Sequence, residues 1–243
     1  MRIRDGRATV TGRLGAGSQE LVRREPFECG THDPVEVADG PGGGTMRRLL
    51  LVRHAPTSAT RRLAFPADEP LDELGRVAAT ALSAAVPSRC AVLCSPSARC
   101  LQTAAAAGLT VDAIEHAIAE CDFGAWAGRT LEDVTAAEPG AGMAWMTDPD
   151  AAPHGGESLR VFASRVARWL DAQATLDGGA VTITHGGVVK AAIVAALRAP
   201  IETFWRVDAA PLAITELHAH DGRWTLTRAN AALEKEALPC CAS

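Results

Sequence analysis

From Met46 onward, short apolar runs of strand length alternate with longer segments in which apolar residues recur every three to four positions. The first pattern is typical of buried strands, and the second is typical of helices that cover one face of a sheet. Their alternation predicts an α/β fold with a mostly parallel sheet between two layers of helices, a three-layer α/β/α architecture. Strands are expected at 47–52, 90–94, within 110–120, 180–184, 212–219 and 223–229, and helices at 70–86, 97–108, 157–173 and 187–199.

The helical stripes name the side chains that should be buried. In 157–173, one face carries Leu159, Phe162 and Val166, followed by Trp169 and Leu170. Segment 70–86 is expected to form a single helix with one apolar stripe facing the sheet. The members of that stripe are Leu71, Leu74, Val77, Ala78, Ala81, Leu82 and Ala85.

Two regions depart from the simple alternation. The last two strands flank His-Asp-Gly-Arg at 220–223, a turn-forming sequence, so they predict an antiparallel hairpin at the edge of the sheet. Residues 121–156 are rich in Trp, Pro and Gly and predict a small irregular insertion with short helices.

The first 45 residues differ from the rest of the chain. They have mixed charges, few apolar clusters, no sustained period of 3.6 or 2, and a terminal Pro-Gly-Gly-Gly-Thr. Two interpretations are open: 1–45 is a disordered N-terminal extension, or Met46 is the natural start and the start at Met1 is mis-assigned. In both, the domain is expected to cover 46–243.

Composition and charge narrow the class of protein. The chain of 243 residues is 47% hydrophobic and 22% charged, with a net charge of -5, which argues against a nucleic-acid surface. No apolar run is long enough to span a membrane, and the N-terminus lacks the apolar core of a secretory signal. Seven scattered cysteines without a C-x-x-C pair fit reduced thiols better than disulfides or a zinc site. We therefore expect a cytoplasmic protein without a metal or other cofactor.

Two predicted strands run directly into histidine. LLLVRHAPT places Arg53 and His54 after the first strand, and AVTITHGGV places His185 after the strand at 180–184. The carboxyl ends of parallel strands form one edge of the sheet, where ligands bind. If the two strands are neighbours, both imidazoles face one crevice. Gly186 and Gly187 then begin a helix whose free amides could hold an anion.

Arg99 adds a third candidate. It lies in the first turn of the helix expected at 97–108, which Ser95 or Ser97 could cap. A cation there opposes the helix dipole, so Arg99 is either directed at an anion or a solvated surface residue. The position alone does not separate these interpretations.

Four segments, LVRHAPT, SPSARCLQTA, ECDFGAWAG and THGGVV, occur in this order. Together they resemble the signature segments of the histidine phosphatase (phosphoglycerate mutase-like) superfamily over about 46–230. The resemblance implies that His54 accepts the phosphoryl group, while Arg53, Arg99 and His185 bind it. It also implies that Glu120 is the general acid. Neutral imidazole is both a good phosphoryl acceptor and a good leaving group, which suits such a role.

The segment after the nucleophile departs from the family's pattern. The family usually has glycine where this chain has Ala55, and Pro56 follows. Alanine adopts a positive φ only at a cost, so this position puts full activity in question. Thr57 matches a common hydroxyl position near the phosphate, and capping the next turn is an equal alternative. We expect substrate contacts from Arg53, Thr57, Arg99, His185 and Gly186.

The resemblance leaves three functional classes. A histidine acid-type phosphatase, hydrolysing a small phosphorylated metabolite through a phosphohistidine without a metal, is favoured. A phosphoglycerate mutase typically has a serine and an asparagine soon after its nucleophile and a longer insertion, whereas the corresponding turn here is RHAPTSAT and the folded part is shorter. A non-catalytic phosphate-binding relative is the third class. The short insertion resembles that of α-ribazole phosphatase-like proteins. The expected partner is the small phosphorylated substrate, with no nucleic acid or membrane, and the protein is expected to be a monomer or homodimer.

Overall fold

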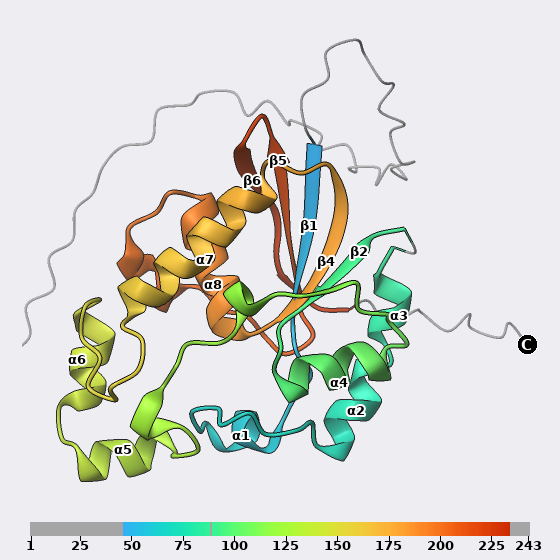
Figure 1. The fold of residues 1–243 in the computed structure, drawn as a ribbon. Coiled ribbons are helices and arrows are strands. Elements are labelled where there is room, and N and C mark those ends of the chain that lie inside the picture. Colours follow the sequence, from blue (N-terminus) through green and yellow to red (C-terminus); the bar gives the residue numbers. More distant parts are fainter. Residues whose placement is uncertain (1–45, 88, 234–243) are drawn as a thin grey trace, which may run out of the picture. The chain divides into compact units, whose positions relative to one another are not determined.

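The computed structural model describes residues 46–87 and 89–233, and the predicted N-terminal extension at 1–45 lies outside them. Six strands form one sheet in the order β3-β2-β4-β1-β5-β6 (Figure 1). The pairs among β1 to β4 are parallel, whereas β5 is antiparallel to both β1 and β6. The predicted mostly parallel α/β sheet is therefore confirmed. The strands are β1 (Met46–Arg53), β2 (Ala91–Cys94), β3 (Ala113–Ile114), β4 (Gly178–Thr184), β5 (Ile214–His220) and β6 (Arg223–Ala231).

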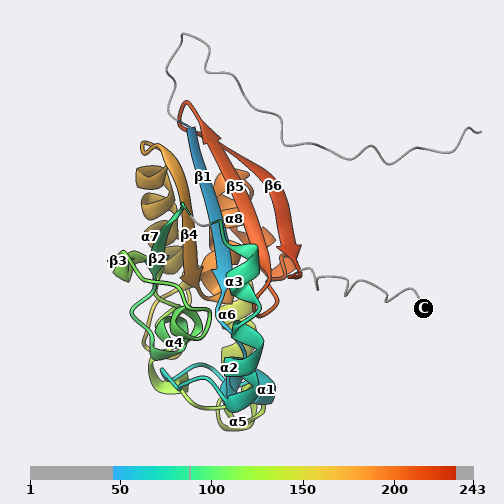
Figure 2. The same ribbon diagram turned by 90° about the vertical axis from the view of Figure 1, so that its right-hand side faces the viewer.

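Helices cover both faces of the sheet (Figure 2). The α-helices are α1 (Ser58–Arg62), α2 (Glu73–Ala79), α3 (Leu82–Ala85), α4 (Ala98–Ala106), α5 (Leu131–Ala137), α6 (Ala141–Thr147), α7 (Leu159–Gln173) and α8 (Gly186–Ala196). Short 3-10 helices are η1 (His116–Ile118), η2 (Gly124–Trp126) and η3 (Ile201–Arg206). In the part of the chain that the structure describes, no helix is both long and apolar enough to cross a bilayer.

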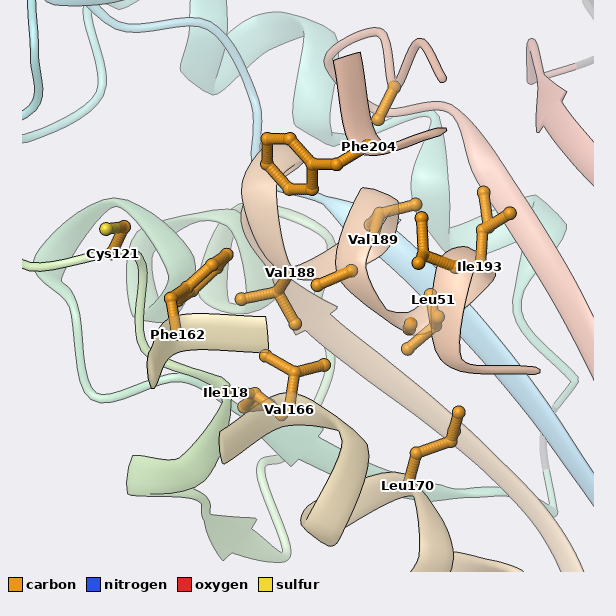
Figure 3. Close-up of a cluster of buried hydrophobic side chains, with 14 of the residues drawn as sticks. Leu51, Ile118, Cys121, Phe162, Val166, Leu170, Val188, Val189, Ile193 and Phe204 are labelled. Carbon is orange, nitrogen blue, oxygen red and sulfur yellow. The ribbon is translucent and has the colours of Figure 1, made fainter. Parts of the chain in front are cut away.

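Alternation along β1 divides the core between the two faces. Leu49 and Leu51 belong to the cluster that contains the apolar stripes of α7 and α8. Leu50 and Val52 point the other way and pack in a second cluster with side chains of α3 and α4. Figure 3 shows the first cluster, in which residues of α7 and α8 surround Leu51. Successive strand side chains point to opposite faces, so a strand buried on both sides is apolar throughout.

The helix predicted at 70–86 is wrong in two respects. It is divided into α2 and α3, and Leu74 and Val77 of the expected stripe are 68% and 62% exposed. The side of α2 that is buried carries Gly75 and Ala79 instead. A Cβ on Gly75 would lie 2.1 Å from the carbonyl oxygen of Pro56, so the helix packs through its smallest residues. The buried face of α2 is therefore set by how closely its backbone approaches that of Pro56. A pattern of apolar residues carries no information about such an approach.

The hairpin and the insertion follow the prediction. β5 and β6 are joined by Asp221 and Gly222, both with positive φ, as a tight hairpin turn requires. The region 121–156 contains only the short elements η2, α5 and α6 among irregular segments. The insertion therefore lies beside the carboxyl edge of the sheet without adding a strand to it.

Candidate active site

The two histidines emerge side by side because their strands are neighbours. In the parallel ladder of β1 and β4, Arg53 lies opposite Thr184, so the next residues, His54 and His185, leave the sheet at the same level. The backbone N–H of His54 also donates to the Thr184 carbonyl oxygen at 2.8 Å. The two ring centroids are 5.3 Å apart in an edge-to-face arrangement. The structure thus brings together the pair that the sequence places 131 positions apart.

One hydrogen bond fixes the tautomer of His54. Its Nδ1 lies 2.7 Å from the carbonyl oxygen of Ala55. A carbonyl oxygen only accepts, so Nδ1 carries the hydrogen and Nε2 keeps its lone pair. The side chain is buried, with 5% of its surface exposed. Nε2 is therefore the ring nitrogen of His54 that is free to act as a nucleophile.

His185 has the opposite tautomer. Nη2 and Nε of Arg99 approach its Nδ1 at 3.1 and 3.3 Å, and a guanidinium only donates. The hydrogen is therefore on Nε2, which lies 2.8 Å from the hydroxyl of Ser95 and 3.1 Å from that of Ser97. Ser97 is the first flanking residue of α4 but makes no side-chain cap bond. The expected capping role of these serines is replaced by a bond to the histidine.

Burial and neighbouring cations keep both imidazoles neutral. Burial, followed by the charge of Arg99, lowers the pKa of His54 to about 3. The same two causes, in the same order, lower the pKa of His185 well below its ordinary value. A neutral imidazole is the form that attacks phosphorus. His54 is therefore in its reactive form throughout the neutral and mildly acidic range.

Two guanidinium nitrogens at this site find no hydrogen-bond acceptor among the described residues. They are Nε of Arg53 and Nη1 of Arg99, both buried. Nη1 of Arg99 lies 3.8 Å from the carboxylate of Asp68, too far for a hydrogen bond. Unpaired buried donors are costly, so they indicate a site built for an anion. Arg99 is only 3% exposed, so the interpretation of a solvated surface arginine is wrong.

Glu120 occupies the amino end of α8. Its Oε2 accepts from the backbone N–H of Gly187 at 3.3 Å, and its Oε1 accepts from the N–H of Cys121 at 3.1 Å. A Cβ on Gly187 would lie 2.2 Å from Oε1, so glycine is required for this approach. The amide of Gly187, predicted to be free for a phosphate, therefore holds the Glu120 carboxylate. Gly186, also expected to contact substrate, lies against the guanidinium of Arg53.

Arg165 of α7 holds the segment that carries Glu120. Its guanidinium donates to the carbonyl oxygens of Ala117, Ala119 and Glu120 at 2.9, 3.0 and 3.2 Å. It also forms a two-pronged ion pair with Glu157, with contacts of 2.9 and 2.6 Å. A planar guanidinium can satisfy several fixed acceptors at once, which lysine cannot. Arg165 therefore fixes the backbone from which Glu120 extends.

Ala55 and Thr57 follow His54 in the turn after β1. Thr57 is fully buried, its hydroxyl accepts from the N–H of Thr60 to cap α1, and it donates to Glu69 at 2.9 Å. In this arrangement the hydroxyl makes protein contacts, and its predicted substrate contact stays a prediction. Ala55 has a negative φ, and its N–H donates to the hydroxyl of Thr103. The usual glycine is therefore not needed here for backbone geometry.

Two cavities meet at Glu120. One, of about 260 Å³ and called the polar cavity below, is lined by Asp68, Ser97 and Arg99 together with two prolines and an alanine. The other, of about 200 Å³, is lined largely by aromatic side chains and by Lys190. Glu120 and Cys121 line both. A wider groove of about 600 Å³ lies elsewhere, along α1 and α5, and is lined by none of the predicted site residues.

Several residues at the site carry sequence signals that the motif pattern did not use. Arg165 lies three positions after Phe162, next to the apolar stripe of an amphipathic helix. A cation at such a position indicates a specific partner. Lys190 is one of two lysines in the chain and interrupts an otherwise apolar helix. Phe204 and Trp205 gave no distinguishing signal, because η3 lies far along the chain. Within 46–87 and 89–233, no three His, Cys, Asp or Glu side chains gather as metal ligands; the metal-free site stays a prediction.

Comparison with known proteins agrees with this arrangement. Residues 49–232 match the family model of the histidine phosphatase superfamily, branch 1, and the chain belongs to this family. Among curated relatives, glucosyl-3-phosphoglycerate phosphatase of Mycolicibacterium vanbaalenii is 34% identical over 175 residues. The alignment covers 65% of this chain and 78% of that protein.

Solved structures show the same fold. The mycobacterial glucosyl-3-phosphoglycerate phosphatase Rv2419c, in a complex with VO3, aligns with a TM-score of 0.68 and 29% identity, covering 76% of this chain and all of that chain. The α-ribazole phosphatase of Shigella flexneri aligns with a TM-score of 0.66 and 26% identity, covering 78% and 99%. These relatives are phosphatases, and they differ in the substrate that their names state.

Proposed function

We propose that the protein is a metal-independent phosphomonoester hydrolase of the acid type that works through a phosphohistidine at His54. The observation that carries the proposal is the free lone pair of His54 Nε2 at a site with buried, unpaired guanidinium nitrogens of Arg53 and Arg99. Charge-assisted bonds from those nitrogens would neutralise the equatorial oxygens of a transferring phosphoryl group. The low pKa of His54 supports an acidic working range, since the nucleophile stays neutral there.

In the first step, Nε2 of His54 forms a bond to phosphorus as the bond from phosphorus to the ester oxygen breaks. Glu120 donates a proton to the departing alkoxide, which leaves as the alcohol. In the second step, Glu120 removes a proton from water as the water oxygen attacks phosphorus. The bond from phosphorus to nitrogen breaks, inorganic phosphate leaves, and both side chains return to their initial states.

The related proteins are phosphatases whose names state different substrates. They support hydrolysis of a phosphate monoester but do not favour an α-ribazole phosphate-like compound over other substrates. The test is rapid quenching with a ³²P-labelled monoester, followed by ³¹P NMR of the denatured protein. Acid-labile, base-stable phosphorus on nitrogen is expected, and it should be absent in His54→Asn. Hydrolysis should persist in the presence of a chelator. Label on an oxygen, or loss of activity on chelation, would refute the mechanism.

A phosphoglycerate mutase is the alternative enzyme class. The same experiment distinguishes the mutase from the hydrolase when 3-phosphoglycerate is supplied and the position of its phosphate is followed. Release of inorganic phosphate supports the hydrolase, whereas accumulation of 2-phosphoglycerate would replace it by the mutase. A protein that retains bound phosphate but turns over no monoester would be the non-catalytic relative.

A further inference from the structure

The aromatic cavity adjoins the polar cavity, because Glu120 and Cys121 line both. Its lining includes six aromatic side chains from five separate parts of the chain: Phe65, Phe123, Trp145, Phe162, Phe204 and Trp205. Glu120 lines both cavities and Arg99 lines only the polar one, so a phosphate bound by Arg99 could have its ester oxygen next to Glu120. The carbon skeleton of the alcohol then extends into the aromatic cavity.

The cavity walls are already packed against one another. Trp205 makes edge-to-face contacts with Phe204 and Trp145, with centroids 5.0 and 6.2 Å apart. Phe162 contacts Phe204 in the same way at 6.4 Å. Such contacts fix ring orientations, so the cavity keeps its shape without a ligand. Its volume of about 200 Å³ suits one small ring system, since an engineered apolar cavity of about 150 Å³ can hold a benzene ring.

Lys190 gives the cavity one positive group. Its ammonium lies 4.3 Å from the ring centroid of Phe204 and 5.3 Å from that of Trp205. Among the described residues it forms no ion pair with a carboxylate. Burial lowers the pKa of Lys190, while the charges of Glu120 and Asp208 oppose this. A partly desolvated cation without a carboxylate partner favours an anionic group on the ligand.

We infer that the substrate is a phosphate monoester whose alcohol carries a small aromatic ring and an anionic group that pairs with Lys190. This inference rests on the proposed hydrolase function of the same site. A polyol is less suited, because Glu120 and Lys190 are the only charged side chains that the described residues contribute to walls that are otherwise mainly aromatic. Stacking and a single ion pair together would select the aromatic acid.

The test compares four primary alkyl phosphates with the full-length protein, so that the leaving oxygen is chemically alike in all. They are ethyl phosphate, glycerol 1-phosphate, 2-phenylethyl phosphate and the phosphate of 4-(2-hydroxyethyl)benzoate. We expect kcat/KM to rise at least tenfold from ethyl to phenylethyl, and at least fivefold again with the carboxylate. In Lys190→Met, the ratio of carboxylated to uncarboxylated ester should fall to about one. Arg168→Met, an exposed cation on α7, should keep the wild-type ratio.

The outcomes separate this inference from the function on which it rests. Equal kcat/KM for all four esters, or a preference for glycerol 1-phosphate, would leave a phosphatase but overturn the aromatic acid. An unchanged carboxylate ratio in Lys190→Met would overturn the assigned ion pair. Failure to hydrolyse any monoester would overturn the hydrolase itself. Thermal unfolding of each variant checks that a change in the ratio of kcat/KM values does not result from unfolding of the variant.

Discussion

Ala55 shows how a departure from a family pattern is judged by backbone geometry. Its φ is negative and its side chain is buried, so the methyl group adds packing and costs no strain. Whether the family's usual glycine is needed could not be decided from sequence, because φ depends on how the turn after β1 is closed. The N–H of Ala55 donates to Thr103, and that contact sets the turn.

We therefore expect Ala55→Gly to change kcat/KM by less than about twofold. Its free energy of unfolding should fall by about 0.5–1 kcal/mol, since glycine has more freedom in the unfolded chain. Steady-state kinetics and urea unfolding measure both quantities. A severalfold gain in kcat would mean that alanine impairs the site.

At Gly187, in contrast to Ala55, the exchange of glycine and alanine is expected to impair activity. A Cβ there would collide with Glu120 Oε1, so Gly187→Ala must displace the proposed general acid. We expect kcat on 2-phenylethyl phosphate to fall at least tenfold, the loss for one misplaced acid. The loss on 4-nitrophenyl phosphate should be much smaller, because nitrophenolate leaves without protonation.

Gly142→Ala is the matched control, because a Cβ at this helical glycine meets only Leu131 at 3.9 Å. It should leave both rates near those of the wild type. An equal loss on both esters in Gly187→Ala would indicate general distortion and not loss of the acid.

At the scale of elements, α7 both builds the core and positions the site. Phe162 and Val166 face the sheet, and Arg165 between them reaches three carbonyl oxygens of the segment before Glu120. Arg165→Met should remove these bonds while keeping most of the apolar stem. We expect kcat to fall about tenfold or more on alkyl esters, with a smaller fall on 4-nitrophenyl phosphate, since Glu120 loses its fixed position.

Arg168→Met provides the comparison on the same helix. Arg168 is exposed, and its side chain bonds only to the Ser164 carbonyl oxygen among the described residues. Its rates and its leaving-group dependence should match those of the wild type. If Arg165→Met lowers stability but not the ratio between the two esters, Arg165 is a structural residue alone.

Most elements could be predicted from apolar periodicity, because the sheet is covered on both faces and its strands are continuous apolar runs. The exception, 70–86, shows the limit of that method. Leu74 and Val77 fit the apolar stripe but are exposed. Gly75 and Ala79 are buried instead, because small residues let the helix backbone come closer to its neighbour. Periodicity reports which residues prefer burial and says nothing of how near two backbones can come.

At the scale of the whole molecule, the site divides into parts that sequence order reveals and parts that only folding assembles. His54 and His185 could be paired because both follow strands, and the register of β1 and β4 brings them together. The aromatic cavity could not be predicted, because Phe65, Phe162 and Trp205 share no motif or spacing. Side chains that converge from separate loops leave no local pattern.

Neutral buried histidines should also make the folded state sensitive to acid. The pKa of His54 is about 3 in the folded protein and 6.5 in its ordinary state, so between these pH values the unfolded chain binds more protons. Stability should therefore fall as pH falls through this window. His54→Asn should reduce the slope of unfolding free energy near pH 4–5 by up to about 1.4 kcal/mol per pH unit, one proton.

Urea unfolding at several pH values measures this slope. The exposed His116→Asn serves as control for the loss of an imidazole elsewhere on the molecule. An unchanged slope in His54→Asn would mean that His54 takes up a proton equally in both states, contrary to its burial beside Arg99.

The in-register parallel ladder of β1 and β4 has a consequence for engineering. Adjacent strands are held about 4.8 Å apart by backbone hydrogen bonds, so the sheet sets the spacing of the two backbone positions from which the imidazoles extend. The insertion at 121–156 could then be exchanged for another of compatible ends while the phosphoryl chemistry is retained. Such chimaeras would have a different substrate specificity but the same catalytic residues.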